Sequence, residues 1–214
     1  MSLHTLRSTL LASFALSMVA FAQPNATVDT HFQVRYVSNL NLGDSVVNIT
    51  NSGARGAGLA AGTTAATTGA ICVNVYAFSP DEQMISCCSC AVTPNGLVSL
   101  SARRDLVNNT LTPAVPTSIV VKLVASTPVR GSCSGSAASW DGLTSGMLAF
   151  GTTVHAGAAA GSEAAITETQ FLPATLSGGE FERLRNLCTF INANGSGFGI
   201  CSTCRLGGLG AGRL

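Results

Sequence analysis

The cysteines are the residues of this chain whose type and spacing most clearly allow chemistry. There are eight of them, and three lie within four positions of the stretch QMISCCSC. A thiolate can bind a metal, attack a disulfide or pair with a second cysteine, and the redox compartment decides among these uses. All eight are disulfide candidates: Cys72, Cys87, Cys88, Cys90, Cys133, Cys188, Cys201 and Cys204.

The first 22 residues have the pattern of a secretory signal peptide. Arg7 precedes an uncharged apolar run that ends in Ala-Phe-Ala at residues 20–22. This run is shorter than the about 20 residues that a bilayer requires. We therefore expect cleavage before Gln23 and a protein that is secreted to the cell exterior, the cell surface or the periplasm, with no membrane span after cleavage. An even number of cysteines in an exported protein indicates four disulfides.

Strand geometry favours one disulfide. The segments around Cys72 and Cys88 resemble two strands joined by a short turn, and successive side chains of a strand point to opposite faces. Cys88 and Cys90 should therefore share a face, while Cys87 points into the core with Ile85. A hairpin register that gathers the apolar residues sets Cys72 opposite Cys88, within disulfide distance.

A metal site is the competing interpretation. Two cysteine pairs have the spacing of zinc knuckles and together could supply four thiolates to one ion. These pairs are Cys87 with Cys90 and Cys201 with Cys204. Export disfavours the metal site because thiols outside the cytosol tend to oxidise. A redox-active dithiol at Cys201 and Cys204 is a further alternative, although the glycine-rich residues that follow are a poor helix for lowering a thiol pKa.

The sequence contains no recognisable catalytic motif. A nucleophile elbow, a phosphate loop and a dinucleotide fingerprint are all missing from it. His31 and His155 are the histidines beyond the predicted signal peptide, and His155 with Glu168 and a serine could act as acid and base. A histidine at a strand end is more often structural. We expect no enzyme activity, no catalytic residue and no cofactor.

Composition limits the partners. Charged residues make up 10% of the chain, the net charge is +1 and the one basic cluster is Arg103-Arg104. Nucleic-acid binding needs clustered Lys and Arg, so no nucleic-acid partner is expected. A weakly charged surface offers little repulsion between copies, which makes a second copy of the chain the expected partner.

The elements that must position the cysteines are mainly β-strands. In residues 32–37, for example, Phe32, Val34 and Tyr36 alternate with polar residues, which is the period of a half-buried strand. No helices alternate with the strands, which favours an antiparallel β-sandwich, Ig-like or related. The expected strands are residues 32–37, 46–49, 71–78, 84–90, 97–101, 119–125, 147–154 and 166–172.

One C-terminal helix is predicted over residues 178–194. Ser177 and Glu180 have the spacing of a capping box, and apolar residues recur at helical period through Cys188. Residues 23–204 should form a single sandwich domain that includes this helix. The residues from 205 to 214 should be a flexible Gly-rich tail.

Three segments resemble exported cysteine-rich proteins of acidobacterial-type soil bacteria. They are ICVNVYAFSPDEQMISCCSCAVTPNGL, NTLTPAVPTSIVVKL and NANGSGFGICSTC. The resemblance implies bacterial export and brings no assigned activity.

The expected function is that of an exported structural or adhesive protein, a self-assembling subunit of a surface filament. One alternative is an exported metal-binding or thiol-redox protein that uses the two Cys-x-x-Cys pairs. A second alternative is a carbohydrate-binding module or hydrolase. The aromatics with a polar edge are Tyr36, Tyr76 and Trp140, and a sugar-stacking platform would have to use Trp140. The sequence Trp-Asp-Gly at 140–142 is expected to anchor a loop instead.

Overall fold

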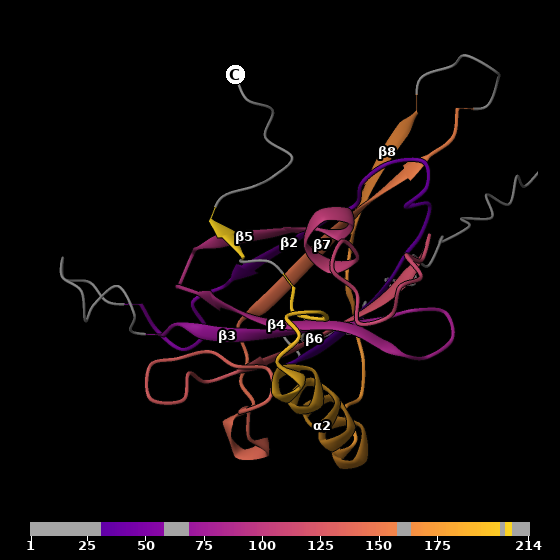
Figure 1. The fold of residues 1–214 in the computed structure, drawn as a ribbon. Coiled ribbons are helices and arrows are strands. Elements are labelled where there is room, and N and C mark those ends of the chain that lie inside the picture. Colours follow the sequence, from indigo (N-terminus) through magenta and orange to yellow (C-terminus); the bar gives the residue numbers. More distant parts are fainter. Residues whose placement is uncertain (1–30, 58–68, 158–163, 202–203, 207–214) are drawn as a thin grey trace, which may run out of the picture.

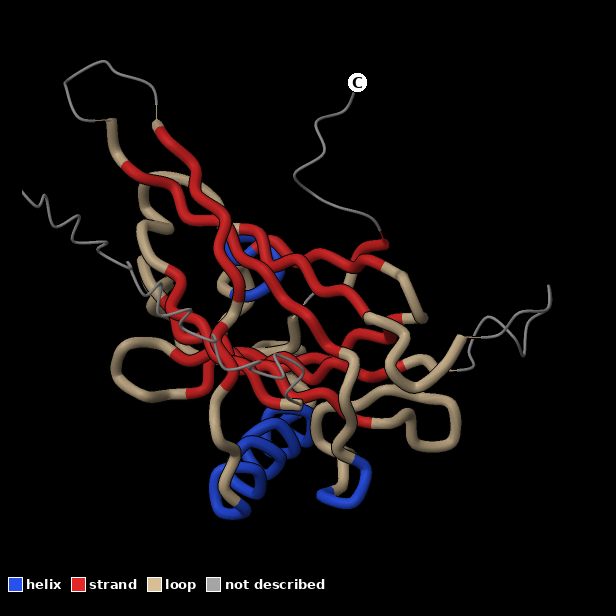
Figure 2. Tube along the Cα trace, turned by 180° about the vertical axis from the view of Figure 1, so that it is seen from behind, coloured by secondary structure: helices blue, strands red, loops and turns tan. Residues whose placement is uncertain are grey.

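The computed structural model describes residues 31–57, 69–157, 164–201 and 204–206. Two five-stranded antiparallel sheets pack face to face, and one helix covers the outer face of one of them (Figure 1). Figure 2 shows the same layers from behind, with the helix against one sheet. The prediction of an antiparallel β-sandwich with one C-terminal helix is confirmed, and an Ig-like relationship stays a prediction.

The chain crosses between the two sheets several times. Sheet A has the order β4-β3-β6-β1-β9, and sheet B has the order β10-β5-β2-β7-β8. Sheet A consists of β1 (Phe32–Val37), β3 (Ile71–Phe78), β4 (Met84–Val92), β6 (Ile119–Ser126) and β9 (Leu172–Pro173). Sheet B consists of β2 (Val46–Asn51), β5 (Leu97–Ser101), β7 (Met147–His155), β8 (Ala165–Gln170) and β10 (Arg205–Leu206). Two short helical turns were not predicted: a π-helix at Ala102–Leu106 and a 3-10 helix at Trp140–Gly142.

Strand β3 separates two apolar layers. All eight of its residues are buried, because it lies between β4 and β6 and is covered on both faces. Val73 and Val75 belong to the core between the sheets, whereas Tyr76 and Phe78 face the helix. Burial on both faces explains why this strand is a nearly continuous apolar run.

The helix α2 (Gly178–Asn194) begins and ends at the predicted residues. The Ser177 Oγ accepts a hydrogen bond from the Glu180 backbone N–H at 3.1 Å, which supplies the N-cap, and Gly195 ends the helix with a φ of 68°. Four residues pack against sheet A: Phe181, Leu184, Cys188 and Ile191. The Lys122 Nζ on β6 donates to the Glu180 Oε1 at 2.6 Å and adds an ion pair to this contact.

Both chain ends extend beyond the described residues. The predicted signal peptide, residues 1–22, lies outside them, as do residues 207–214 of the predicted tail. Arg205–Leu206 pair with β5, so the tail was predicted to start too early. Within the described ranges, no helix has the length and apolar character needed to cross a membrane.

Candidate functional site

All eight cysteines form disulfides, so the prediction of four disulfides is confirmed. Each bond joins residues far apart in the sequence, with separations from 61 to 114. The pairs are Cys72–Cys133, Cys87–Cys188, Cys88–Cys201 and Cys90–Cys204.

The predicted Cys72–Cys88 disulfide is wrong because the hairpin register differs. Ala91 is opposite Cys72, and Val75 is opposite Cys88. Phe78 is opposite Met84, and the irregularity between Ala77 and Phe78 moves the pairing one residue further along β4. Cys72 instead bonds to Cys133 in the loop that follows β6.

Neighbouring cysteines of β4 face opposite layers, as predicted. Cys87 belongs to the layer under the helix and bonds to Cys188 of α2. Cys88 and Cys90 share the other face and contact the core between the sheets. The predicted association of Cys87 with Ile85 is wrong, because an irregularity of the β3–β4 ladder leaves Ile85 without a partner and turns it to the opposite face.

One side of the sandwich is closed by the segment that follows α2. The Cys87 backbone N–H donates to the Gly199 carbonyl at 2.8 Å, and the Cys201 N–H donates to the Cys87 carbonyl at 3.2 Å. This segment therefore covers the free edge of β4, where Cys88–Cys201 and Cys90–Cys204 fasten it. It continues into β10, which pairs with β5 and covers the corresponding edge of sheet B.

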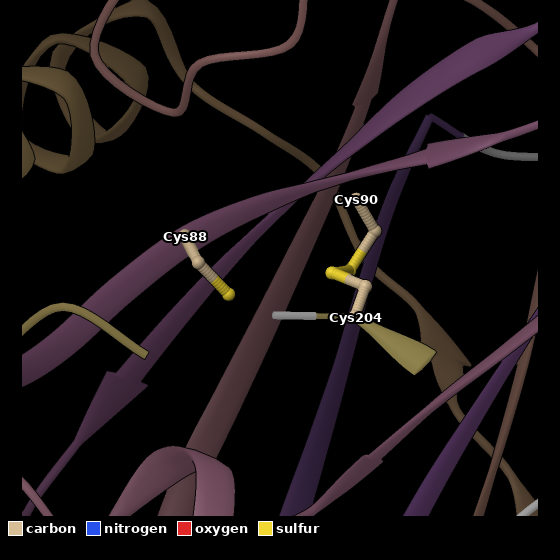
Figure 3. A group of neighbouring side chains, drawn as sticks. All are labelled: Cys88, Cys90 and Cys204. Atoms are coloured by element: carbon tan, nitrogen blue, oxygen red, sulfur yellow. A yellow bond between two sulfur atoms is a disulfide. The ribbon is translucent and has the colours of Figure 1, made fainter. Parts of the chain in front are cut away.

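The predicted metal site is not assembled. Its four ligands were Cys87, Cys90, Cys201 and Cys204, but Cys87 points toward the helix. The cysteine that lies beside the others is Cys88. The Sγ atoms of Cys88, Cys90 and Cys204 all lie within 4.8 Å of one another (Figure 3).

The opposite side of the sandwich is open. β9 pairs with β1 at Gln33 and Val34 alone, and β8 pairs with β7 and with no second strand of the described residues. The His31 carbonyl accepts a hydrogen bond from the Ala125 N–H of β6, so the backbone polar groups of His31 point toward β6. Because neighbouring residues of a strand direct their N–H and C=O groups to opposite sides, those of Tyr36 point away from β6, beyond the end of β9.

A groove of about 760 Å³ lies between these open edges. Tyr36, Leu172 and neighbouring aliphatic residues contribute apolar surface, and other residues of the walls carry hydroxyl, amide, imidazole and guanidinium groups. Its residues are Val34, Arg35, Tyr36, Ser38, Thr153, His155, Thr167, Thr169, Gln170, Leu172, Pro173 and Ala174.

Arg35 connects the two sheets within this groove. Its Nη2 donates to the Thr153 Oγ1 at 3.0 Å, and its Nη1 donates to the Thr169 carbonyl at 2.9 Å and to the Thr169 Oγ1. The guanidinium carbon lies 5.9 Å from the centre of the Phe171 ring. Burial lowers the pKa of Arg35, while the charge of Glu168 raises it. Arg35 therefore places a charged group within a groove whose lining is otherwise largely apolar.

The sequence pattern missed this role because it did not show that the polar face of β1 also turns inward, toward the space between the sheets, while Phe32 packs under the helix. Gln33 is fully buried, and its Nε2 donates to the Met147 carbonyl at 2.8 Å, whereas Tyr36 is 62% exposed. Polar side chains can enter the space between the sheets because backbone carbonyls and hydroxyls of β7 and β8 satisfy them. The alternation of the strand was the signal, but it does not say which face is inside.

The candidate catalytic residues are not brought together. The His155 Nε2 lies 2.8 Å from the Thr167 Oγ1 within the groove, whereas the Glu168 Oε1 accepts from the Asn48 Nδ2 at 2.8 Å. Glu168 is the neighbour of Thr167 on β8, so its side chain takes the other face of sheet B. The described residues therefore offer no acid–base pair of His155 and Glu168.

The aromatic residues do not form a platform for sugar stacking. Tyr76 is fully buried, and its hydroxyl donates to the Gly135 carbonyl at 2.7 Å. Trp140 meets the ring of Phe181 at a centroid distance of 5.6 Å, edge to face. It connects its loop to α2, in agreement with an anchoring role.

No protein-family model matches the chain, and no curated protein or solved structure matches it.

Proposed function

We propose that this protein is an exported structural or adhesive protein that associates with further copies of itself by adding a strand at the open side of the sandwich. Four disulfides are compatible with export because they persist in oxidising compartments. Secretion to the cell exterior, the cell surface or the periplasm, and assembly into a filament, are parts of this proposal.

The contrast between the two sides of the sandwich carries the proposal. On one side, backbone pairing and two disulfides cover the edges of β4 and β5. On the other side, β8 presents six residues, and none of its side chains is buried. An uncovered edge offers N–H and C=O groups to another chain, and proteins that stay apart protect such edges.

The β8 edge also lacks the residues that usually block pairing. Its sequence AITETQ contains no proline and no lysine, and Glu168 is its one charged residue. The Phe171 N–H donates to the Ala149 carbonyl of β7. By alternation, the N–H and C=O groups of Ile166, Glu168 and Gln170 then point away from β7.

The groove beside this edge suits an extended peptide. Six residues of strand span about 20 Å, and an incoming strand would take its affinity from main-chain hydrogen bonds. Alternate side chains of that strand would enter the groove, where Tyr36 and Leu172 give apolar contact and the threonine hydroxyls accept or donate hydrogen bonds.

The experiment is a measurement of assembly by the protein from residue 23 onward. Light scattering coupled to size-exclusion chromatography over a wide concentration range should show reversible growth in mass, and negative-stain microscopy should show the particles formed. A protein that keeps the mass of one chain at the highest concentration would contradict the proposal.

A further inference from the structure

The two disulfides that fasten the C-terminal segment bring three of their four sulfur atoms into one compact group, to which the fourth is bonded. Cys88 and Cys90 project from the same face of β4, and Cys204 lies beside them (Figure 3). The Sγ atoms of these three residues lie within 4.8 Å of one another, and the Cys201 Sγ is bonded to that of Cys88. No other group of three His, Cys, Asp or Glu ligand atoms is this compact in the part of the chain that the structure describes.

This arrangement resembles the donor set of a structural zinc site. Zn²⁺ binds four thiolates tetrahedrally at about 2.3 Å, which separates the sulfur atoms by about 3.8 Å. Two ligands would come from alternate positions of a strand and two from a Cys-x-x-Cys segment. The strand and the segment are held side by side by hydrogen bonds between the Cys87 backbone and Gly199 and Cys201, and these do not depend on the disulfides chemically.

The partial exposure of two of these cysteines would let a reductant and a metal ion reach the sulfur atoms. Cys88 and Cys204 are partly exposed, whereas Cys90 and Cys201 are buried behind them. The Cys87–Cys188 disulfide, in contrast, has both cysteines only 1% exposed. A reductant should therefore reach the bonds of the C-terminal segment before it reaches the bond to α2.

We propose that, after reduction of these two disulfides, Cys88, Cys90, Cys201 and Cys204 bind one Zn²⁺ and hold the C-terminal segment on β4 in the same place. A phosphine or dithiol reductant supplies two electrons per disulfide, and each disulfide takes up two protons to give two thiols. Zinc then displaces four protons and forms a four-thiolate complex with a charge of −2, without any change in the oxidation state of the metal. This site is separate from the open side of the sandwich, so it does not depend on the proposed self-assembly.

The test uses the protein from residue 23 onward, reduced by a phosphine under nitrogen and freed of reductant. Cobalt(II) serves as a spectroscopic probe of tetrahedral thiolate coordination, and elemental analysis after gel filtration gives the bound zinc. We expect one zinc ion per chain and cobalt spectra of a tetrahedral thiolate site that zinc abolishes. Zinc should also slow the proteolysis of the C-terminal segment in the reduced protein.

Two double variants separate this site from non-specific thiol binding. Cys90→Ser with Cys204→Ser should lose stoichiometric zinc binding and the cobalt spectrum. Cys87→Ser with Cys188→Ser removes the same number of thiols and should still bind one zinc ion, because Cys87 lies on the other face of β4. Stoichiometric zinc in the first variant, its loss in the second, or no stoichiometric zinc in the reduced parent protein, folded or unfolded, would overturn the proposal.

Discussion

Arg35 of β1 occupies the space in which any side chain on Gly151 of β7 would have to lie. A Cβ atom built on Gly151 would lie 2.7 Å from the Arg35 Cδ and 3.0 Å from its Cζ. Gly151 therefore lets the Arg35 guanidinium pass between the sheets to Thr153 and Thr169. The shape of the open side depends on this contact between the two sheets.

Gly151→Ala should lower the free energy of unfolding by about 1–3 kcal/mol, because a methyl group in this space forces Arg35 or the sheets to move. Urea unfolding followed by circular dichroism measures the change. Gly178→Ala is the matched control, since nothing lies within 4 Å of its added Cβ. In a double-mutant cycle, Arg35→Ala should remove most of the penalty of Gly151→Ala, and strictly additive effects would contradict the contact.

Tyr76→Phe should cost about 1–3 kcal/mol of stability, because it leaves the buried Gly135 carbonyl without its hydrogen bond. Denaturant unfolding at neutral pH gives the value. Tyr36→Phe is the matched control: Tyr36 is exposed, so its loss should change the free energy of unfolding by less than about 0.5 kcal/mol. Equal effects of the two substitutions would argue against the buried hydrogen bond.

Deprotonation of Tyr76 should unfold the protein at alkaline pH. Burial raises the pKa of Tyr76, so the folded protein holds this proton more tightly than the unfolded chain does. The resulting stability is complete below the unfolded tyrosine pKa of about 10 and is lost as the pH rises above it. In a Tyr36→Phe protein, Tyr76 is the one remaining tyrosine, and its phenolate absorbance should appear together with the loss of the circular dichroism signal. Phenolate that forms in the folded protein near pH 10 would contradict this expectation.

Loss of the Cys87–Cys188 disulfide should release α2 from sheet A. Cys87→Ala with Cys188→Ala should cost about 2–5 kcal/mol, and hydrogen exchange should accelerate most in the amides of α2. Cys72→Ala with Cys133→Ala is the comparison: its sequence separation is 61 rather than 101, so the chain-entropy loss is smaller by about half a kcal/mol. Exchange in α2 that responds equally to both pairs would show that the first disulfide has no special role in holding the helix.

The edge of β8 should control self-association. Ile166→Lys adds a charge to this edge and should weaken association by about tenfold, which corresponds to about 1.4 kcal/mol, when measured by analytical ultracentrifugation. Glu168→Pro removes an N–H that points away from β7 and should act in the same direction.

Phe190→Lys is the control for Ile166→Lys. It changes an apolar residue of similar exposure, 61% against 67%, on the helix rather than on the edge. If both lysine substitutions weakened association equally, general surface polarity rather than the β8 edge would be responsible.

The sequence predicts the helix and most strands well because their signals are local, but residues 166–172, expected as one strand, are divided between β8 of one sheet and β9 of the other. The strand predicted from the apolar run at 71–78 and the helix predicted from the Ser177–Glu180 capping box have the same bounds in the structure. Neighbouring cysteines in β4 also follow local geometry, so the opposite directions of Cys87 and Cys88 could be foreseen.

The site is less predictable because it depends on pairing between distant segments. The partner of Cys72 is set by a hairpin register that an irregular ladder shifts, and the apolar pattern alone suited a different register. The inward direction of Arg35 needs Thr153 and Thr169 from other strands, which no pattern in residues 32–37 reveals. The covering of two sheet edges by residues 199–201 and 205–206 likewise has no local signal.

The C-terminal segment covers the edges of β4 and β5, and its place in the chain imposes an order on folding during synthesis. Of the strands that the structure describes, all but β10 precede Gly199 in the chain, as does α2, so the residues that close one side of the sandwich leave the ribosome after these elements. The Cys88–Cys201 and Cys90–Cys204 bonds span 113 and 114 residues, so neither can form before the C-terminal segment has been made. Both edges therefore stay open to wrong partners until this segment has been made, and a chain cut short before Gly199 keeps most of its core while it loses the cover of this side.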